Sequence, residues 1–204
     1  MLTILTRVVG PVRTNCYIAF DAAARRGVVI DPGDDAEDIL SVIRQNHLEI
    51  THILLTHSHF DHILALPEVH RATGAPIGVH ERDAAALSCV KGSLYARFYG
   101  DSGFRPMTPG FTFGEGTRIE TGAGVFTVLH TPGHTPGSSC FDTGEALFCG
   151  DTLFAESCGR IDFDGGDADA MRASLRRLYE LPGERMCYPG HDRAFRLSEA
   201  RLYN

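Results

Sequence analysis

The sequence has no apolar run that approaches the roughly 18 residues needed to span a bilayer. It also has no excess of positive charge, because 19 Lys and Arg residues face 26 Asp and Glu residues, which gives a net charge of −7. Binding to a phosphate backbone needs clustered basic residues that displace counterions, so this balance argues against a nucleic-acid partner. The opening residues, MLTILTRVVGPVRT, are too short and too interrupted for the apolar region of a signal peptide. We therefore expect a cytoplasmic protein with no membrane and no nucleic-acid partner.

The six cysteines form neither a C-x-x-C pair nor a compact disulfide framework. Cys16, Cys140 and Cys149 lie in apolar, strand-like runs, where a free cysteine usually packs as a small hydrophobe. Cys158 lies in a loop, and its role stays open. This cysteine usage is typical of a reducing compartment.

The chain has 204 residues, of which 43% are hydrophobic and 22% are charged. This is an ordinary composition for a folded protein, and a domain typically has about 100–200 residues. The sequence contains no internal repeat and no linker. We expect a single domain over residues 1–204.

Short β-branched or aromatic runs, bounded by Gly, Pro or charged turns, predict strands. These strands are expected at residues 3–8, 15–20, 27–30, 52–55, 76–79, 117–120, 125–130, 138–141, 146–149 and 186–188. Apolar residues at helical spacing predict helices at residues 35–45, 61–73, 81–87, 167–178 and 198–202. Residues 88–110 have no clean period and are expected to form a long loop or a partly helical excursion. This order predicts an α/β protein with four layers, in which two sheets are flanked by helices.

The most specific motif is Thr-His-Ser-His-Phe-Asp-His at residues 56–62, where a buried strand ends. Three imidazoles and a carboxylate within six residues suit a divalent metal site. His57 and His59 are two apart on extended backbone and should point to the same side. Asp61 and His62, at the start of the predicted helix, can turn toward a second metal position close to the first. Ligand sites of α/β sheets gather at the carboxyl ends of strands, which is where this motif lies.

Three further candidate ligands each follow a predicted strand and a glycine-containing turn. They are His134 in Thr-Pro-Gly-His-Thr-Pro-Gly, Asp151 in Cys-Gly-Asp, and His191 in Tyr-Pro-Gly-His-Asp. A histidine after Pro-Gly is by itself more often a turn residue than a ligand. Because all three recur in the same kind of place, we interpret them together as part of one metal centre.

On these motifs, nearly the whole chain resembles the metallo-β-lactamase superfamily. The resemblance implies an αββα sandwich of two mixed β-sheets, with a binuclear metal site between the sheet edges. The implied ligands of the first metal are His57, His59 and His134. The implied ligands of the second metal are Asp61, His62 and His191. Asp151 would bridge the two metals, an arrangement that resembles the family's hydrolases more than its antibiotic-degrading members.

Residues 150–163, Gly-Asp-Thr-Leu-Phe-Ala-Glu-Ser-Cys-Gly-Arg-Ile-Asp-Phe, are similar to glyoxalase II, the hydroxyacylglutathione hydrolases. The resemblance implies cleavage of a small-molecule thioester, glutathione-derived in those relatives, by a metal-bridging hydroxide. Two divalent ions would lower the pKa of the bridging water, and Asp61 would act catalytically by orienting and helping to deprotonate it. Zinc is the expected metal, although iron and manganese also suit His and Asp ligands. Arg160 matches a basic position that contacts glutathione in relatives, with an ordinary surface arginine as the alternative.

The sequence departs from glyoxalase II in two places. Only 13 residues follow His191, so we expect no C-terminal glutathione-binding helical domain. The Gly-Gly pair usual after Asp-His is replaced by Ile63-Leu64-Ala65. The sequence therefore leaves the physiological substrate open, as it does the oligomeric state.

Two rival functions stay open. Persulfide dioxygenases have a segment similar to residues 158–163 but use one iron, for which His57, His134 and Asp151 would suffice. A lactonase or another hydrolase of the same fold is the second rival, because the same hydroxide opens lactones and amides.

Asp31 precedes Pro32-Gly33 and matches a family position that commonly forms hydrogen bonds near the metal ligands. An ordinary Asp-Pro-Gly turn is the alternative interpretation. The aromatic residues of 88–110 either line a substrate pocket, form a dimer contact or pack the excursion down.

Overall fold

The structure, a computed structural model, describes residues 1–203, with side chains through residue 200. One sheet has six strands, in the order β1 (Leu2–Val9), β2 (Thr14–Asp21), β3 (Arg26–Ile30), β4 (Glu49–Leu54), β5 (Ile77–His80) and β6 (Phe111–Phe113). Its first three strands pair antiparallel, whereas β3 to β6 pair parallel. This first sheet is therefore mixed.

The second sheet also has six strands, in the order β12 (Phe195–Arg196), β11 (Met186–Pro189), β10 (Ala146–Gly150), β9 (Ser139–Asp142), β8 (Gly124–His130) and β7 (Arg118–Thr121). Its only parallel pair among the described residues is β10 with β11. The second sheet is mixed as well.

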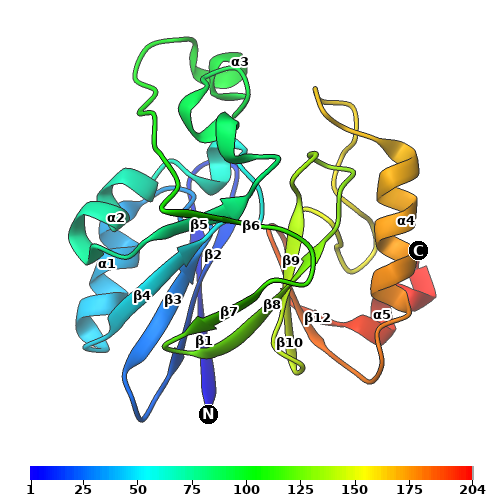
Figure 1. Ribbon diagram of the computed structural model, residues 1–204, viewed down its shortest axis with the longest axis horizontal. Coiled ribbons are helices and arrows are strands. Elements are labelled where there is room, and N and C mark those ends of the chain that lie inside the picture. The colour runs from blue at the N-terminus through cyan, green and yellow to red at the C-terminus, as the bar shows by residue number, and fades with distance from the viewer. Residues whose placement is uncertain (204) are drawn as a thin grey trace.

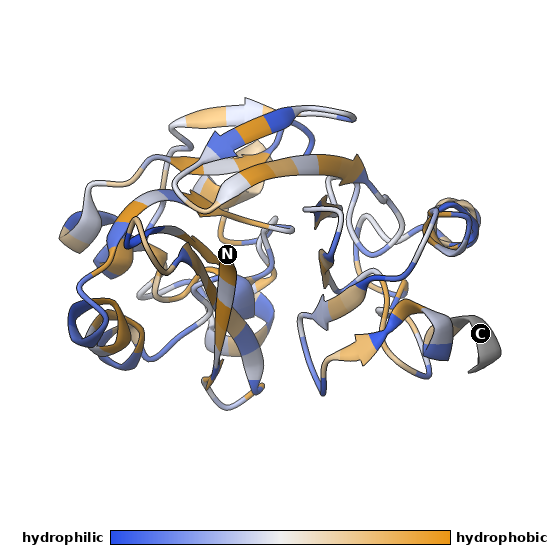
Figure 2. Ribbon diagram, turned by 90° about the horizontal axis from the view of Figure 1, so that it is seen from below, coloured by the Kyte–Doolittle hydropathy of each residue, from blue (hydrophilic) through white to orange (hydrophobic). Residues whose placement is uncertain are grey.

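Helices cover the outer face of each sheet. α1 (Ala36–Gln45) and α2 (Leu66–Thr73) lie on the first sheet, and α4 (Ala168–Tyr179) and α5 (Leu197–Tyr203) lie beside the second (Figure 1). The helical segments at the left of Figure 2 are hydrophobic on the side that faces the strands and hydrophilic on the outer side. The predicted four-layer αββα sandwich of two mixed β-sheets is confirmed. No helix within residues 1–203 is long and apolar enough to cross a membrane.

The space between the two sheets is filled mainly by aromatic side chains. Phe126, Phe141 and Phe148 of the second sheet are fully buried there. The Phe148 ring contacts Tyr17 of the first sheet edge to face, with ring centroids 5.5 Å apart. These large apolar contacts fix the two sheets against each other, and so fix the edge at which their strand ends meet.

Two predicted helices differ from the observed structure. Residues 61–73 were predicted as one helix, but a 3₁₀ turn (Phe60–His62) and an irregular segment precede α2. Pro67 lies in the first turn of α2, where its missing N–H would have no helical partner in any case. In a single helix over residues 61–73 the same proline would lie in the interior and break the hydrogen-bond ladder. Residues 81–87 form a turn and a 3₁₀ segment (Ala84–Ser88) because the Asp83 side chain turns inward and accepts hydrogen bonds from other loops.

The remaining differences concern short elements. β6 and β12 have three and two residues, and such runs are too short to show a strand period. Residues 88–110 contain the helix α3 (Tyr95–Tyr99), which confirms the partly helical excursion (top of Figure 1). The prediction that Cys16, Cys140 and Cys149 pack in the core is also confirmed, because all three are buried.

We predict that Phe148→Ala lowers the free energy of unfolding by about 3–5 kcal/mol, because it leaves a cavity between the sheets. The measurement is chemical denaturation monitored by circular dichroism. The matched control is Val8→Ala, which shortens a side chain that is 49% exposed and should cost less than about 1 kcal/mol. Equal losses in the two variants would contradict the assigned core.

Candidate metal centre

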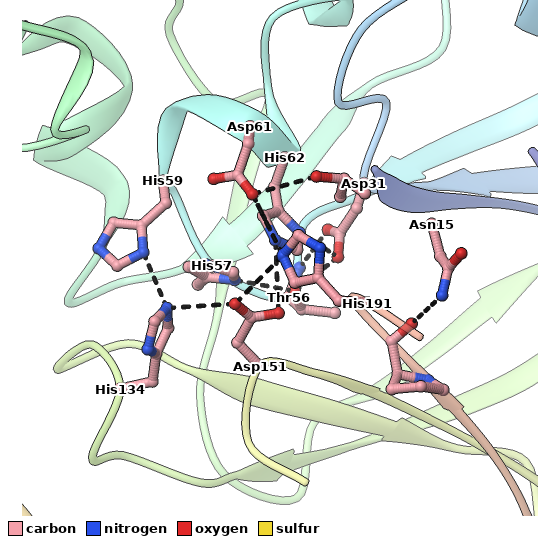
Figure 3. Close-up of polar contacts among 12 residues, drawn as sticks. Asn15, Asp31, Thr56, His57, His59, Asp61, His62, His134, Asp151 and His191 are labelled. Atoms are coloured by element: carbon pink, nitrogen blue, oxygen red, sulfur yellow. Dashed lines mark hydrogen bonds and ion pairs between the residues drawn. The ribbon is translucent and has the colours of Figure 1, made fainter. Parts of the chain in front are cut away.

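All seven predicted ligands lie together at one edge of the sandwich, where strands of both sheets end (Figure 3). Four come from the segment after β4, and one each comes from the loops after β8, β10 and β11. The ligands form three overlapping groups of three residues, and within each group the ligand atoms lie within 4.8 Å of one another. The groups are His57, His59 and His134; His57, His62 and Asp151; and Asp61, His62 and His191. His57 and His62 each belong to two groups, so the groups form one continuous cluster.

Glycines allow the ligand-bearing loops to approach one another closely. A Cβ atom on Gly190, just before His191, would lie 2.1 Å from Oδ1 of Asp151. A Cβ atom on Gly159 would lie 1.9 Å from the carbonyl oxygen of Asp151 and 3.1 Å from Nδ1 of His134. Any larger residue at these two positions would push the ligands apart.

Asp31 fixes the orientation of two ligands. It accepts hydrogen bonds from the Thr56 backbone N–H (2.8 Å) and the Thr56 hydroxyl (2.6 Å), and its Oδ2 lies 3.0 Å from Nδ1 of His62. The Thr56 hydroxyl oxygen lies 3.1 Å from Nδ1 of His57 and can accept a hydrogen bond from it. The Nε2 atoms of His57 and His62 are therefore left free to bind a metal. Asp31 supports the ligands and is more than a turn residue.

His134 is oriented in the same way from the other sheet. Its Nδ1 lies 2.7 Å from the carbonyl oxygen of Arg160, so it donates there, and Nε2 faces the cluster. That Nε2 lies 2.8 Å from Nδ1 of His59 and 3.5 Å from Oδ2 of Asp151. Because Nδ1 of a neutral His134 carries the proton, Nε2 has a free lone pair, which can accept a hydrogen bond from Nδ1 of His59 or bind a metal ion.

Three buried polar atoms at the cluster have no hydrogen-bond partner among the described residues. They are Nε2 of His57, Nε2 of His62 and Oδ1 of Asp151. Native structures rarely leave buried donors and acceptors unpaired, so each such group needs an explanation. Imidazole nitrogens and carboxylate oxygens are ligands of zinc, iron and manganese. The cluster can therefore bind divalent metal ions.

The protonation states also suit metal binding. Burial and the neighbouring His62 hold the pKa of His57 well below its ordinary value, and burial with His134 lowers the pKa of His59 to about 3. Both imidazoles are therefore neutral, as a metal ligand must be. Burial opposes ionisation of Asp151, but the nearby His62 and His191 outweigh it and lower the Asp151 pKa well below its ordinary value.

A positive charge is favoured beside the two carboxylates. Burial lowers the pKa of His191, but its hydrogen bonds to Asp151 and Asp61 outweigh burial and raise this pKa to about 9. His191 Nε2 lies 3.2 Å from Asp61 Oδ2 and 3.5 Å from Asp151 Oδ2. The field that holds a proton on His191 equally favours a bound cation at this position.

A pocket of about 200 Å³ opens above the cluster. Its apolar wall is formed by Val12, Leu94, Phe98 and Phe163, and Arg160 also lines it. Phe98, from α3, packs on the ring of Phe60 with centroids 4.6 Å apart. Of the aromatic residues of the excursion, Phe98 thus lines this pocket and also packs the excursion down.

Arg160 lies at the pocket, as expected of a residue that contacts substrate. Its guanidinium donates two hydrogen bonds of 2.7 Å to Asp162 and lies 3.8 Å from the Phe163 ring centroid. The Asp162 carboxylate therefore balances its charge. A contact between Arg160 and substrate stays a prediction.

The sequence did not reveal two residues that hold the site together. Asp83 accepts hydrogen bonds from the Thr135 hydroxyl (2.8 Å) and the backbone N–H groups of Gly137 (2.7 Å) and Ser58 (3.3 Å). It thereby joins the His57–His59 segment to the His134 loop. Thr14 donates a 3.0 Å hydrogen bond to Oδ2 of Asp61. Both contacts join residues distant in the chain, and no local motif signals them.

Two sheets packed face to face, helices outside them and a His/Asp cluster at their shared edge define a metal-binding αββα protein. The chain belongs to the metallo-β-lactamase superfamily, whose model matches residues 9–191. It is 38% identical to a hydroxyacylglutathione hydrolase of Fuscovulum blasticum, over 86% of this chain and 61% of that protein.

Solved structures give the same family. The B3 metallo-β-lactamase BLEG-1 has a TM-score of 0.90 and 31% identity, covering 100% of this chain and 98% of that one. TTHA1623 in a di-iron-bound form has a TM-score of 0.87 and 36% identity, covering 98% of both chains. The protein is thus an enzyme of the metallo-β-lactamase superfamily with a site able to bind divalent metals. Hydrolysis is its expected type of reaction.

We predict that Asp31→Asn lowers the affinity for divalent metal about 10–100-fold, because His62 and Thr56 lose the carboxylate that orients them. The measurement is competition with a chromophoric chelator. The control, Asp38→Asn on the exposed face of α1, should leave the affinity within twofold. An unaltered affinity in a folded Asp31→Asn variant would contradict the role of Asp31.

Proposed function

We propose that this protein is a metal-dependent hydrolase that cleaves a small-molecule thioester and resembles glyoxalase II in its reaction. The observation that carries the proposal is the group of Asp61, His62 and His191 beside the group of His57, His59 and His134. The two groups provide separate donor sets for two ions, and Asp151 lies within 3.5 Å of His62, His134 and His191. A site for one ion would not need the second group.

When bound, two divalent ions would supply Lewis-acid polarisation of the substrate carbonyl and a water of lowered pKa. Asp61 is the proposed proton acceptor. Its Oδ2 accepts a hydrogen bond from Thr14 and lies beside His191, and its Oδ1 is turned away from these partners (Figure 3). Burial raises the pKa of Asp61, but His62 and His191 outweigh burial and lower this pKa, so the carboxylate is ionised and can accept a hydrogen bond from a water molecule.

A thioester suits the pocket. A thiol has a pKa near 8.5, so a thiolate leaves without the strong acid assistance that an amine or alkoxide needs. The apolar wall of Val12, Leu94 and Phe98 can contact an acyl group beside the cluster. The relative named as a hydroxyacylglutathione hydrolase supports the same substrate class.

We propose zinc as the resident metal, and the di-iron form of a 36% identical relative makes iron the principal alternative. The rival activity is that of a mononuclear iron persulfide dioxygenase. His57, His134 and Asp151 lie close enough to hold a single iron, since Nε2 of His134 is 3.5 Å from Asp151. The second donor group favours the hydrolase.

The decisive experiment measures metal content and thioester cleavage on the same preparation. We expect about two ions per chain, hydrolysis of S-lactoylglutathione, and loss of that activity on chelation. One iron per chain, with oxygen uptake and no hydrolysis, would establish the dioxygenase. Fully loaded protein that cleaves lactones but no thioester would establish the lactonase.

We also predict that Asp61→Asn lowers kcat per bound metal about 10²–10⁴-fold, because the proton acceptor is lost. Metal content is measured for each variant, so that weaker metal binding is not counted as a loss of catalysis. Asp38→Asn, far from the cluster on α1, is the control. A kcat per metal within threefold of the unaltered protein would exclude Asp61 from proton transfer.

A further inference from the structure

The pocket above the metal cluster is lined mainly by hydrocarbon wherever the metal ligands do not line it. Its lining residues, besides five of the predicted ligands and Arg160, are Val12, Phe60, Leu94, Phe98 and Phe163. The Arg160 guanidinium already donates two hydrogen bonds to Asp162. Among residues 1–200, no hydroxyl or amide side chain lines this pocket. A substrate group that lies beside the cluster therefore meets an apolar wall with few polar partners.

Two side chains of this wall are exposed to solvent. Val12 is 45% exposed and Phe98 is 51% exposed, and both line the pocket. Single exposed apolar residues are common, but exposed apolar side chains that gather at one pocket mark a ligand groove. A ligand that covers Val12 and Phe98 removes apolar surface from water, which favours its binding.

The turn that bears Val12 is fixed to one of the metal-ligand loops. This turn lies between β1 and β2, and Asn15 follows it at the start of β2. The Asn15 side-chain amide donates hydrogen bonds to the carbonyls of Pro189 and Asp192 (both 2.9 Å), on either side of His191 (Figure 3). The Val12 part of the wall therefore has a fixed position relative to the ligands.

The excursion that bears Leu94 and Phe98 is fixed to the ligand segment after β4. Phe60 donates its backbone N–H to the Ser93 carbonyl (2.8 Å). The next residue, Leu94, is only 6% exposed and adopts φ 62°, a left-handed conformation that non-glycine residues seldom adopt. Strain of this kind persists where the surrounding structure enforces it and is frequent at binding sites.

Phe163 continues the wall from the excursion to the cluster. Its ring is nearly perpendicular to the Phe98 ring (84°), with centroids 6.4 Å apart, and to the His59 ring (88°), with centroids 6.1 Å apart. Aromatic rings prefer such edge-to-face contacts. The apolar wall therefore begins beside a predicted metal ligand and extends to α3.

The proposed reaction places the substrate carbonyl at the cluster, so one half of the thioester lies against this wall. Common biological thiols have amide groups near the sulfur, and these need hydrogen-bond partners that the wall does not provide. The acyl half is therefore the better occupant. A water molecule takes about 30 Å³ in the liquid, so the pocket of about 200 Å³ has room for several carbon atoms. A small acyl group such as lactoyl would leave much of the wall uncovered.

We propose that this wall selects thioesters with a medium-length hydrocarbon acyl group in preference to small hydroxyacyl thioesters. The acyl chain lies along Phe163 and Phe98 and covers Val12. Phe98 is the principal determinant of this specificity, because it is the most exposed side chain of the wall and has the most apolar surface to lose to a ligand. This inference names the acyl class for the proposed thioester hydrolase and rests on that function.

The kinetic test uses S-lactoylglutathione, S-propanoylglutathione and S-hexanoylglutathione, which have the same thiol and differ only in the acyl group. We expect kcat/KM for the hexanoyl thioester to exceed that for the propanoyl thioester about 10–60-fold, because each of three added methylene groups contributes up to about fourfold when buried. It should also exceed the value for the lactoyl thioester. Equal values, or a decrease with chain length, would overturn the proposal.

The matched variants are Phe98→Ala and Tyr95→Ala, which shorten two aromatic residues of the same short helix. Only Phe98 lines the pocket above the cluster. Phe98→Ala should lower the hexanoyl-to-propanoyl ratio of kcat/KM about tenfold, Phe98→Leu should keep it within threefold of the original, and Tyr95→Ala within twofold. A damaged metal site would lower both values and leave the ratio unaltered. Equal effects of Phe98→Ala and Tyr95→Ala on the ratio would contradict the role of Phe98.

A binding test separates this proposal from the proposed reaction. Calorimetric titration of the metal-loaded protein with hexanoate and propanoate, the two acid products, should give at least fivefold tighter binding of hexanoate, and Phe98→Ala should remove the difference. No binding of hexanoate at millimolar concentration would overturn the proposal. If no thioester is cleaved but the preference for hexanoate depends on Phe98, the thioesterase function is wrong and the apolar site stands. If all three thioesters are cleaved at similar rates, the function stands and the acyl preference is wrong.

Discussion

Imidazoles and carboxylates are packed together at the shared edge of the two sheets, where little solvent reaches them. His62 is buried and the Asp151 side chain is only 11% exposed, each has a polar atom without a hydrogen-bond partner among the described residues, and Asp61 lies beside them. Uncompensated buried charge is costly, so such a cluster is stable only with a cation or with protons that take its place. Metal binding and folding stability are therefore linked in this protein.

The supporting structure explains how ligands from four distant segments reach one place. The aromatic layer of Phe126, Phe141 and Phe148 fixes the distance between the sheets. Asp31 and Asp83 then hold the loops at that edge, Asp31 through Thr56 and His62, and Asp83 across the two sheets. Because the ligands lie on loops, their geometry depends on these two buried carboxylates as well as on the strands.

Prediction from the sequence succeeded where the signal was local. The His57–His62 motif, the glycine turns before Asp151 and His191, and most strands were recognisable from short runs of residues. The helix at 61–73 was wrong because apolar spacing continues across a break that the chain makes to direct Asp61 and His62 inward. Asp83 and Thr14 could not be found, since their partners lie far away in the sequence.

Local patterns in the sequence were enough to predict the αββα fold class, a metal centre and the residues able to provide its ligands, because periodicity and clustered residue types are local properties. The three-dimensional arrangement was needed to show how the donors divide into groups, that the Arg160 charge is balanced by Asp162, and that the turn before β2 meets the His191 loop through Asn15. The physical reason is that pairing and burial of charges depend on which distant loops meet. The Asn15 contacts that bring this turn to the His191 loop join residues more than 170 positions apart.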